Sequence, residues 1–123
     1  MIPRTVLPES TGGDGDPLDA IVIGSAIERG TVVEAKLIGV LWLVDNNERD
    51  DKLITVSQSS SSYDVISDAD LEAAYPGVRE ILEIWFSNYK GLAITNSTGY
   101  GDAEEARKAL KQAIADYLVC DCG

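Results

Sequence analysis

Residues 14–19 read Asp14-Gly15-Asp16-Pro17-Leu18-Asp19, and the apolar run at 20–23 follows immediately. Glycine and proline bend the chain here, so three carboxylates stand close together at the start of an expected strand. Carboxylates this close raise one another's pKa unless a cation lies among them. Their hard oxygen atoms suit Mg²⁺, Mn²⁺ or Ca²⁺ rather than zinc. The stretch predicts a metal-binding corner, although an ordinary turn explains it equally well when it is taken alone.

The composition limits the class of protein. The chain has 123 residues, of which 45% are hydrophobic, and this predicts a single globular domain over 1–123. Its formal charge of −11 disfavours nucleic acid and anionic membranes as partners. No apolar run approaches the roughly 20 residues that span a bilayer. The N-terminus lacks the basic and apolar regions of a signal peptide, so we expect a cytoplasmic protein.

Histidine is absent, which excludes Ser-His and Cys-His catalytic pairs and zinc sites built on histidine. The two cysteines, Cys120 and Cys122, stand near the end of the chain. A disulfide between residues two apart closes a tight, strained ring, so free thiols are the expected state. The candidate site therefore rests on carboxylates.

Residues 31–56 predict a strand, a polar loop and a second strand. The first part, 31–44, is rich in β-branched and large apolar side chains. Gly39 interrupts this run and predicts a bulge or a sharp bend. The loop at 45–51 is polar throughout, and residues 52–56 return to a strand pattern. This unit is the strongest β signal in the chain.

The other segments are predicted from turn residues and from helical spacing. They are an irregular start at 1–13, a short buried strand at 21–23, a flexible serine-rich loop at 57–62 and helices at 68–75, at 76–90 and after Asp102. Asp102 and Glu105 form a capping box for the last helix. The expected buried residues are Val78, Ile81, Leu82, Trp85, Phe86 and Tyr89 on one helix and Ala106, Leu110, Ala113, Ile114, Tyr117 and Leu118 on the other. Strands come first and helices last, which predicts an α+β fold.

Two further motifs carry chemistry. Asp45 and Asp50 lie in the polar loop, and beside the first motif they would complete a site with several carboxylates. Lys52 would then offer its charge to an anionic substrate, whereas the loop taken alone is a solvated hairpin. Tyr89 and Lys90 offer a phenol and an ammonium to a phosphate, or simply place a lysine favourably near a helix C-terminus.

Four motifs occur in a fixed order along the chain. They are D-G-D-P-L-D at 14–19, G-V-L-x-x-x-D-x-x-x-x-D-D-K at 39–52, W-F-x-x-Y-K at 85–90 and G-Y-G-D-A-E-E-A at 99–106. Each motif is moderately specific, and the ordered set is highly specific. Together they resemble the soluble family I inorganic pyrophosphatases, from Met1 almost to the end of the chain.

The resemblance implies a hydrolase of pyrophosphate that depends on Mg²⁺ or Mn²⁺, on an OB-like β-barrel flanked by helices. The residues that match the family's metal-binding aspartates are Asp14, Asp16, Asp19, Asp45 and Asp50. Asp16 would also be the catalytic partner or base of the attacking water. The residues that match phosphate-binding positions are Lys52, Tyr89 and Lys90. Such bound metal ions activate water and neutralise phosphate charge.

Members of that family carry a further N-terminal segment, which supplies the first barrel strands and several site residues. The chain therefore resembles a shortened relative with a partial OB-like barrel and about two C-terminal helices. Loss of a lysine and an arginine from a phosphate site costs about 3–6 kcal/mol, so reduced or lost turnover is expected. The alternative is a non-catalytic relative that binds divalent metal or phosphate, or an oligomeric scaffold. We also expect a homo-oligomer, because association would close the open sheet.

Overall fold

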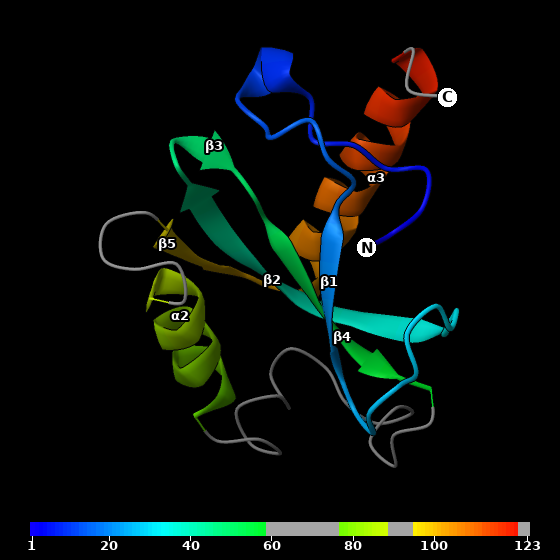
Figure 1. The fold of residues 1–123 in the computed structure, drawn as a ribbon, viewed down its shortest axis with the longest axis vertical. Helices are drawn as coiled ribbons and strands as arrows, with labels where there is room; N and C mark the ends of the chain where they lie inside the picture. Colours follow the sequence, from blue (N-terminus) through cyan, green and yellow to red (C-terminus); the bar gives the residue numbers. More distant parts are fainter. Residues whose placement is uncertain (59–76, 89–94, 121–123) are drawn as a thin grey trace.

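The computed structural model describes residues 1–58, 77–88 and 95–120, and Figure 1 shows how their elements are arranged. In chain order these elements are the 3₁₀ turn η1 (Glu9–Thr11), the strands β1 (Asp19–Ile23), β2 (Ala35–Asp45), β3 (Glu48–Arg49) and β4 (Lys52–Ser57), the helix α2 (Val78–Asn88), the strand β5 (Thr95–Gly101) and the helix α3 (Ala103–Val119). The predicted strand–loop–strand unit is present as β2, β3 and β4. A mixed sheet with two helices confirms the predicted α+β class.

The five strands form one sheet in the order β1-β4-β2-β3, with β5 also paired to β2. β1 runs parallel to β4, whereas β2 pairs antiparallel with β3, β4 and β5. Because Val40 and Leu41 pair with β4 as well as with β5, these two strands lie on opposite edges of β2. β4 lies between β1 and β2, and every residue of β4 is buried. The sheet is therefore centred on β2 and β4.

A bulge between Leu37 and Gly39 determines which face of the sheet each side chain of β2 reaches. Side chains along a strand alternate between the faces, and an extra residue reverses that alternation. Ile38 therefore packs with Leu41, whereas Val40 belongs to the cluster on the opposite face. The bulge predicted at Gly39 is confirmed, and it sets which side chains face which helix.

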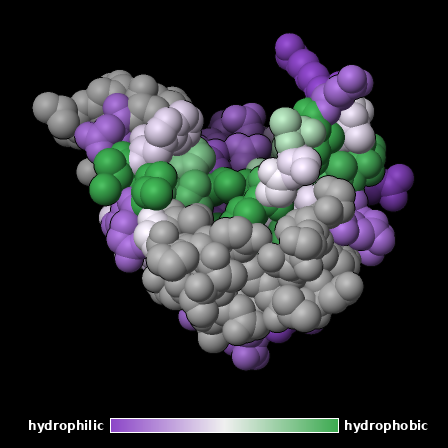
Figure 2. All heavy atoms as spheres, turned by 90° about the horizontal axis from the view of Figure 1, so that it is seen from below, coloured by the Kyte–Doolittle hydropathy of each residue, from purple (hydrophilic) through white to green (hydrophobic). Residues whose placement is uncertain are grey.

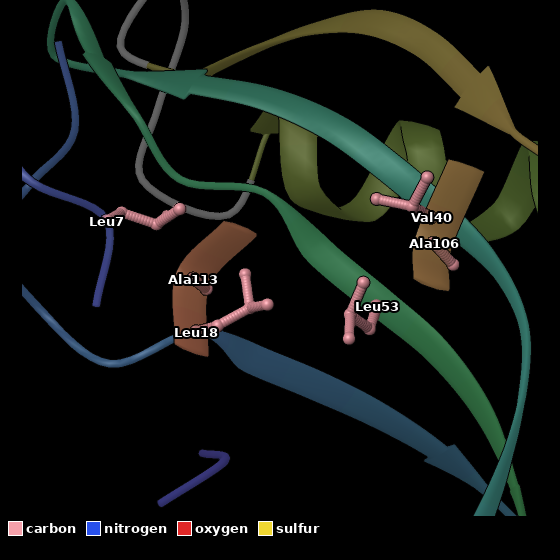
Figure 3. Close-up of a cluster of buried hydrophobic side chains, with 6 residues drawn as sticks. All are labelled: Leu7, Leu18, Val40, Leu53, Ala106 and Ala113. Carbon is pink, nitrogen blue, oxygen red and sulfur yellow. The ribbon is translucent and has the colours of Figure 1, made fainter. Parts of the chain in front are cut away.

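Two apolar clusters flank the sheet. The first consists of Ile38, Leu41, Leu43, Ile54 and Val56, with Leu82 and Phe86 of α2 packed against it. The second consists of Leu7, Leu18, Val40, Leu53, Ala106 and Ala113, and Figure 3 shows these side chains gathered between the sheet and α3. The two alanines let α3 approach the strands closely. The helices α2 and α3 therefore cover opposite faces of the sheet.

The predicted buried faces of the helices are only partly right. Large apolar side chains that the structure leaves exposed are Ile81 (64%), Trp85 (55%), Ile114 (39%) and Leu118 (77%). The ring of Trp85 meets that of Phe86 edge to face, with the ring centroids 4.7 Å apart. Figure 2 shows a band of apolar residues across the face that lies below the view of Figure 1. Helical spacing identified an apolar stripe, but it did not fix which part of the stripe meets the sheet.

The sequence did not predict strand β5. Its residues, Thr-Asn-Ser-Thr-Gly-Tyr-Gly, lack the alternation of apolar and polar side chains that identifies a half-buried strand. β5 forms because β2 offers it an unpaired edge, with register from Val40↔Gly101 to Asp45↔Thr95. Because β5 follows α2, the expectation that all strands precede the helices is wrong.

The terminal cysteines also differ from the expectation. Cys120 is disulfide-bonded, and the described residues contain no free cysteine, so the prediction of free thiols is wrong. Cys122 is the only other cysteine of the chain and lies outside the described residues.

Several predictions fall outside the described residues. These are the serine-rich loop beyond Gln58, the helix at 68–75, and the pair Tyr89 and Lys90. Among the helices that the structure does describe, none has the length and apolar character needed to cross a membrane.

Candidate metal and phosphate site

The loop at 14–19 is held in place by the N-terminal residues, for which the sequence predicts no regular element. The buried Thr5 hydroxyl accepts a hydrogen bond of 2.9 Å from the Leu18 N–H. The Leu7 N–H donates to the Asp16 carbonyl at 3.0 Å, and the Gly15 N–H donates to the Leu7 carbonyl at 2.8 Å. These bonds fix the loop backbone, so its carboxylates project from a clamped turn.

Gly13 lies at the base of this loop, where the chain passes close to Leu7. A Cβ at Gly13 would stand 2.6 Å from the Leu7 carbonyl carbon and 2.8 Å from its Cβ. Gly13→Ala is therefore expected to lower the free energy of unfolding by about 2 kcal/mol, as measured by urea denaturation. The control is Gly12→Ala, where φ is +87° but no atom lies within 4 Å, so a loss of about 1 kcal/mol is expected. Equal losses in the two variants would contradict the close approach.

An open hollow of about 920 Å³ brings the residues of the first two motifs together. The candidate residues that line it are Asp14, Asp16, Asp19, Asp45, Asp50 and Lys52. The parallel pairing of β1 with β4 sets Asp19 opposite Lys52, at the first residue of each strand. Asp45 ends β2, and Asp50 lies between β3 and β4. Tyr89 and Lys90, the other two candidate residues, lie outside the described residues.

Lys52 forms two short charged contacts in the hollow. Its Nζ lies 2.7 Å from Oδ2 of Asp19 and 2.9 Å from Oδ1 of Asp50. Burial alone lowers the pKa of Lys52, but the hydrogen bonds to these two carboxylates outweigh that effect and the pKa is raised. Lys52 is therefore a charged ammonium held between two of the candidate metal ligands.

The carboxylates of Asp14, Asp16 and Asp50 lie close enough to repel one another. Burial raises the pKa of the Asp14 carboxyl, the N–H of Asp16 opposes this at 3.0 Å, and the charges of Asp50 and Asp16 raise the pKa further. A cation among these groups would relieve the repulsion, and an all-oxygen donor set suits a hard divalent ion. Within the described residues, no three acidic side chains are already drawn together around one point as metal ligands. The residues fit a divalent ion in chemistry and in location, and binding would require their side chains to move together.

Asp51 is a buried charged residue that the sequence did not single out. Its side chain is 5% exposed, and one carboxylate oxygen lies 3.1 Å from Nε of Arg49. Burial raises the pKa of the Asp51 carboxyl from 3.8 to about 6, although Arg49 and the Leu43 N–H act in the opposite direction. Asp51 lines a second, smaller hollow against α3 rather than the one that holds Lys52. Opposite charges recur two residues apart here, in Arg49 with Asp51 and in Asp50 with Lys52, and this spacing is the signal that Asp50 and Asp51 face different sides.

The fold and the hollow together define a class of protein: an α+β domain with an acidic, lysine-containing hollow suited to a divalent cation and an anionic ligand. Residues 1–118 match the family model for inorganic pyrophosphatase, and the chain belongs to this family. Membership implies a divalent metal cofactor.

Individual relatives agree with this assignment. The chain is 33% identical over 116 residues to the inorganic pyrophosphatase of Neisseria meningitidis serogroup B, covering 88% of this chain and 63% of that protein. It is 38% identical over 91 residues to inorganic pyrophosphatase 1 of Caenorhabditis elegans, covering 72% of this chain and 21% of that protein. The chain therefore spans less than two thirds of the length of these relatives.

Solved structures show the same fold. The Helicobacter pylori inorganic pyrophosphatase superposes with a TM-score of 0.80 at 31% identity, over 95% of this chain and 68% of that chain. The T brucei brucei enzyme superposes with a TM-score of 0.83 at 27% identity, over 94% of this chain and 38% of that chain. These matches confirm the predicted fold class, an α+β fold of the OB-like pyrophosphatase type.

Proposed function

We propose that this chain carries out the hydrolysis of inorganic pyrophosphate to phosphate with Mg²⁺ as the cofactor, with Mn²⁺ as a substitute. The observation that carries the proposal is the hollow in which Asp14, Asp16, Asp19, Asp45 and Asp50 meet Lys52. Membership of the inorganic pyrophosphatase family supports the choice of substrate.

Each candidate residue of the hollow has a role in this proposal. The five aspartates would hold the divalent ion, which, when bound, neutralises phosphate charge and lowers the pKa of a water towards about 7. Asp16, whose side chain is exposed at the hollow, orients the attacking water and accepts its proton. The water oxygen bonds to one phosphorus while the bridging P–O bond breaks, which releases two phosphates. Lys52, with Tyr89 and Lys90 by their motif, binds phosphate oxygens.

A second candidate is binding of divalent metal and phosphate with little or no turnover. It is favoured by the scarcity of positive side chains: along the part of the chain that the structure describes, Lys52 is the one lysine or arginine that lines the hollow. A pyrophosphate carries several negative charges, and each missing charged hydrogen bond costs about 1.5–3 kcal/mol. Because of this cost, we expect a lower turnover than at a site that holds more cations.

We also propose that the protein forms a homo-oligomer. Among the described strands, β1 pairs with β4 and with no other, so no described strand occupies its second edge. An edge of this kind is a template for pairing between copies. Light scattering at micromolar concentration should give at least twice the mass of one chain, and a stable monomer would refute this part of the proposal.

The activity is tested by phosphate release from pyrophosphate with millimolar Mg²⁺. We expect release that Asp16→Asn lowers at least 100-fold, because the amide cannot take the proton of the attacking water. The matched control is Glu104→Gln, which changes an exposed carboxylate at the start of α3 to an amide and should leave the rate unchanged. Phosphate binding without release would favour the second candidate. Release that survives Asp16→Asn would contradict the proposed role of Asp16.

A further inference from the structure

We propose that Lys52 is the internal counter-ion of the metal-free site, and that a divalent ion has to displace its ammonium from Asp19 and Asp50 in order to bind. The inference rests on the proposed function, because it takes these aspartates as metal ligands. It adds a second role to Lys52, which otherwise serves only to bind phosphate. It also predicts an order of events, with metal first and phosphate second.

The strand pairing fixes the position of the Lys52 ammonium. Asp19 and Lys52 are register partners on the parallel strands β1 and β4, so their backbones are fixed next to each other. Asp50 stands two residues before Lys52, and its carboxylate reaches the same nitrogen at 2.9 Å, while Asp19 reaches it at 2.7 Å. The Lys52 side chain is only 10% exposed. Such short contacts to a charged donor are the strong type of hydrogen bond.

The ammonium and a divalent ion compete for the same two carboxylates. Mg²⁺ binds its oxygen ligands at roughly 2.0–2.1 Å. An ion this close to the carboxylates of Asp19 and Asp50 would strongly repel the Lys52 ammonium that contacts the same carboxylates. Oδ2 of Asp19 and Oδ1 of Asp50 already accept from Lys52. An ion bound to these oxygens therefore excludes the ammonium. The flexible four-carbon stem of lysine allows the nitrogen to swing away while its backbone stays in β4.

Displacement has a consequence for the anionic ligand. In the metal-free site, two carboxylates neutralise the Lys52 charge, so the ammonium is not available to a phosphate. Once an ion takes Asp19 and Asp50, Lys52 is released into a hollow that it already lines. Lys52 thus holds Asp19 and Asp50 together before the metal binds, and it binds the anion afterwards.

The experiment is a calorimetric titration of Mg²⁺ into the wild-type chain and into Lys52→Met, Lys52→Arg and Lys111→Met. We expect Lys52→Met to bind Mg²⁺ about tenfold more tightly, because no charge-assisted hydrogen bonds have to be broken. Lys52→Arg keeps a cation at the site and should stay within about threefold of wild type. Lys111→Met makes the same charge change on the exposed surface of α3 and should leave the affinity unchanged. In the absence of metal, Lys52→Met should melt at a lower temperature than wild type, because Asp19 and Asp50 lose their counter-ion.

The outcomes separate this inference from the proposed function. Mg²⁺ binding that is equal or weaker in Lys52→Met than in wild type would overturn the counter-ion role while leaving the metal site intact. Absence of Mg²⁺ binding in wild type and in Lys111→Met would overturn the metal site and, with it, the inference. If Lys52→Met does not fold, the ¹⁵N signal of the wild-type Lys52 ammonium supplies the readout. We expect that signal to shift on Mg²⁺ addition, and an unchanged signal at saturating Mg²⁺ would refute displacement.

Discussion

Replacement of Leu53 by alanine is expected to lower the free energy of unfolding by about 3 kcal/mol. Leu53 is fully buried on β4, between β1 and β2, and belongs to the cluster drawn in Figure 3. Its neighbours there are Leu18, Val40, Ala106 and Ala113. Because these neighbours lie on the paired strands, on the clamped loop and on α3, they cannot close the cavity that the missing methyl groups would leave. Urea denaturation monitored by circular dichroism measures the change.

The matched control for this variant is Val22→Ala. Val22 lies on the neighbouring strand β1 and is 37% exposed, so we expect a loss below about 1 kcal/mol. Since a domain of this size has a total stability of about 5–15 kcal/mol, the Leu53 variant should be visibly closer to unfolding at room temperature. Similar losses at the two positions would show that β4 is not the centre of the core.

Combined replacement of Asp14, Asp16 and Asp19 by asparagine is expected to abolish the stabilisation of the protein by magnesium. Millimolar Mg²⁺ should raise the melting temperature of the wild-type chain by several degrees, because an ion that binds only the folded state stabilises it. Asparagine keeps the size of each side chain but removes the charge that holds a divalent ion. Differential scanning fluorimetry with and without Mg²⁺ gives the shift for each protein.

This variant also has an expected effect without metal. Burial and the neighbouring carboxylates raise the pKa of Asp14, which means that its charged form is costly in the folded state. Asparagine removes that cost at Asp14, but the triple variant also loses the Asp19 carboxylate that pairs with Lys52 at 2.7 Å, so without metal it should melt below the Asp14→Asn single variant. The control combines Glu104→Gln with Asp116→Asn on α3, two carboxylates that do not line the hollow. A magnesium shift that persists in the triple variant would refute the assignment of these aspartates.

The central strands could be predicted from the sequence because their signals are local. The apolar runs predicted β2 and β4, and Gly39 predicted the bulge that shifts the alternation of side chains along β2. The N-cap of α3 could also be predicted from the sequence, and in the structure the Asp102 carboxylate accepts a hydrogen bond of 2.8 Å from the Glu105 N–H. Each of these features depends on residues within a few positions of one another.

The features that the sequence missed depend on distant partners. β5 is a polar segment that becomes a strand only because β2 offers it an edge. The clamp from Thr5 to Leu18 joins residues 13 apart and has no periodic signal. The exposure of Trp85 depends on how α2 is turned against the sheet, which helical spacing does not specify.

The candidate site likewise has features that the sequence predicted and features that only the tertiary structure shows. The ordered motifs predicted that the aspartates of 14–19 belong with Asp45, Asp50 and Lys52, and all of them line one hollow. The ion pairs of Lys52 with Asp19 and Asp50 were not predicted, because they require the parallel register of β1 with β4. Side-chain pairing of this kind follows from the tertiary structure alone.

The most direct test of the metal site is a titration of the ¹⁵N-labelled chain with Mn²⁺, followed by nuclear magnetic resonance. Unpaired electrons of Mn²⁺ broaden the signals of nearby nuclei, so the pattern of lost signals locates the ion. We predict that the amide signals of residues 14–19 and 45–52 are lost first, and that excess Mg²⁺ restores them. Broadening centred instead on the acidic start of α3, at Asp102, Glu104 and Glu105, or spread evenly over the chain, would contradict a divalent-metal site in this hollow.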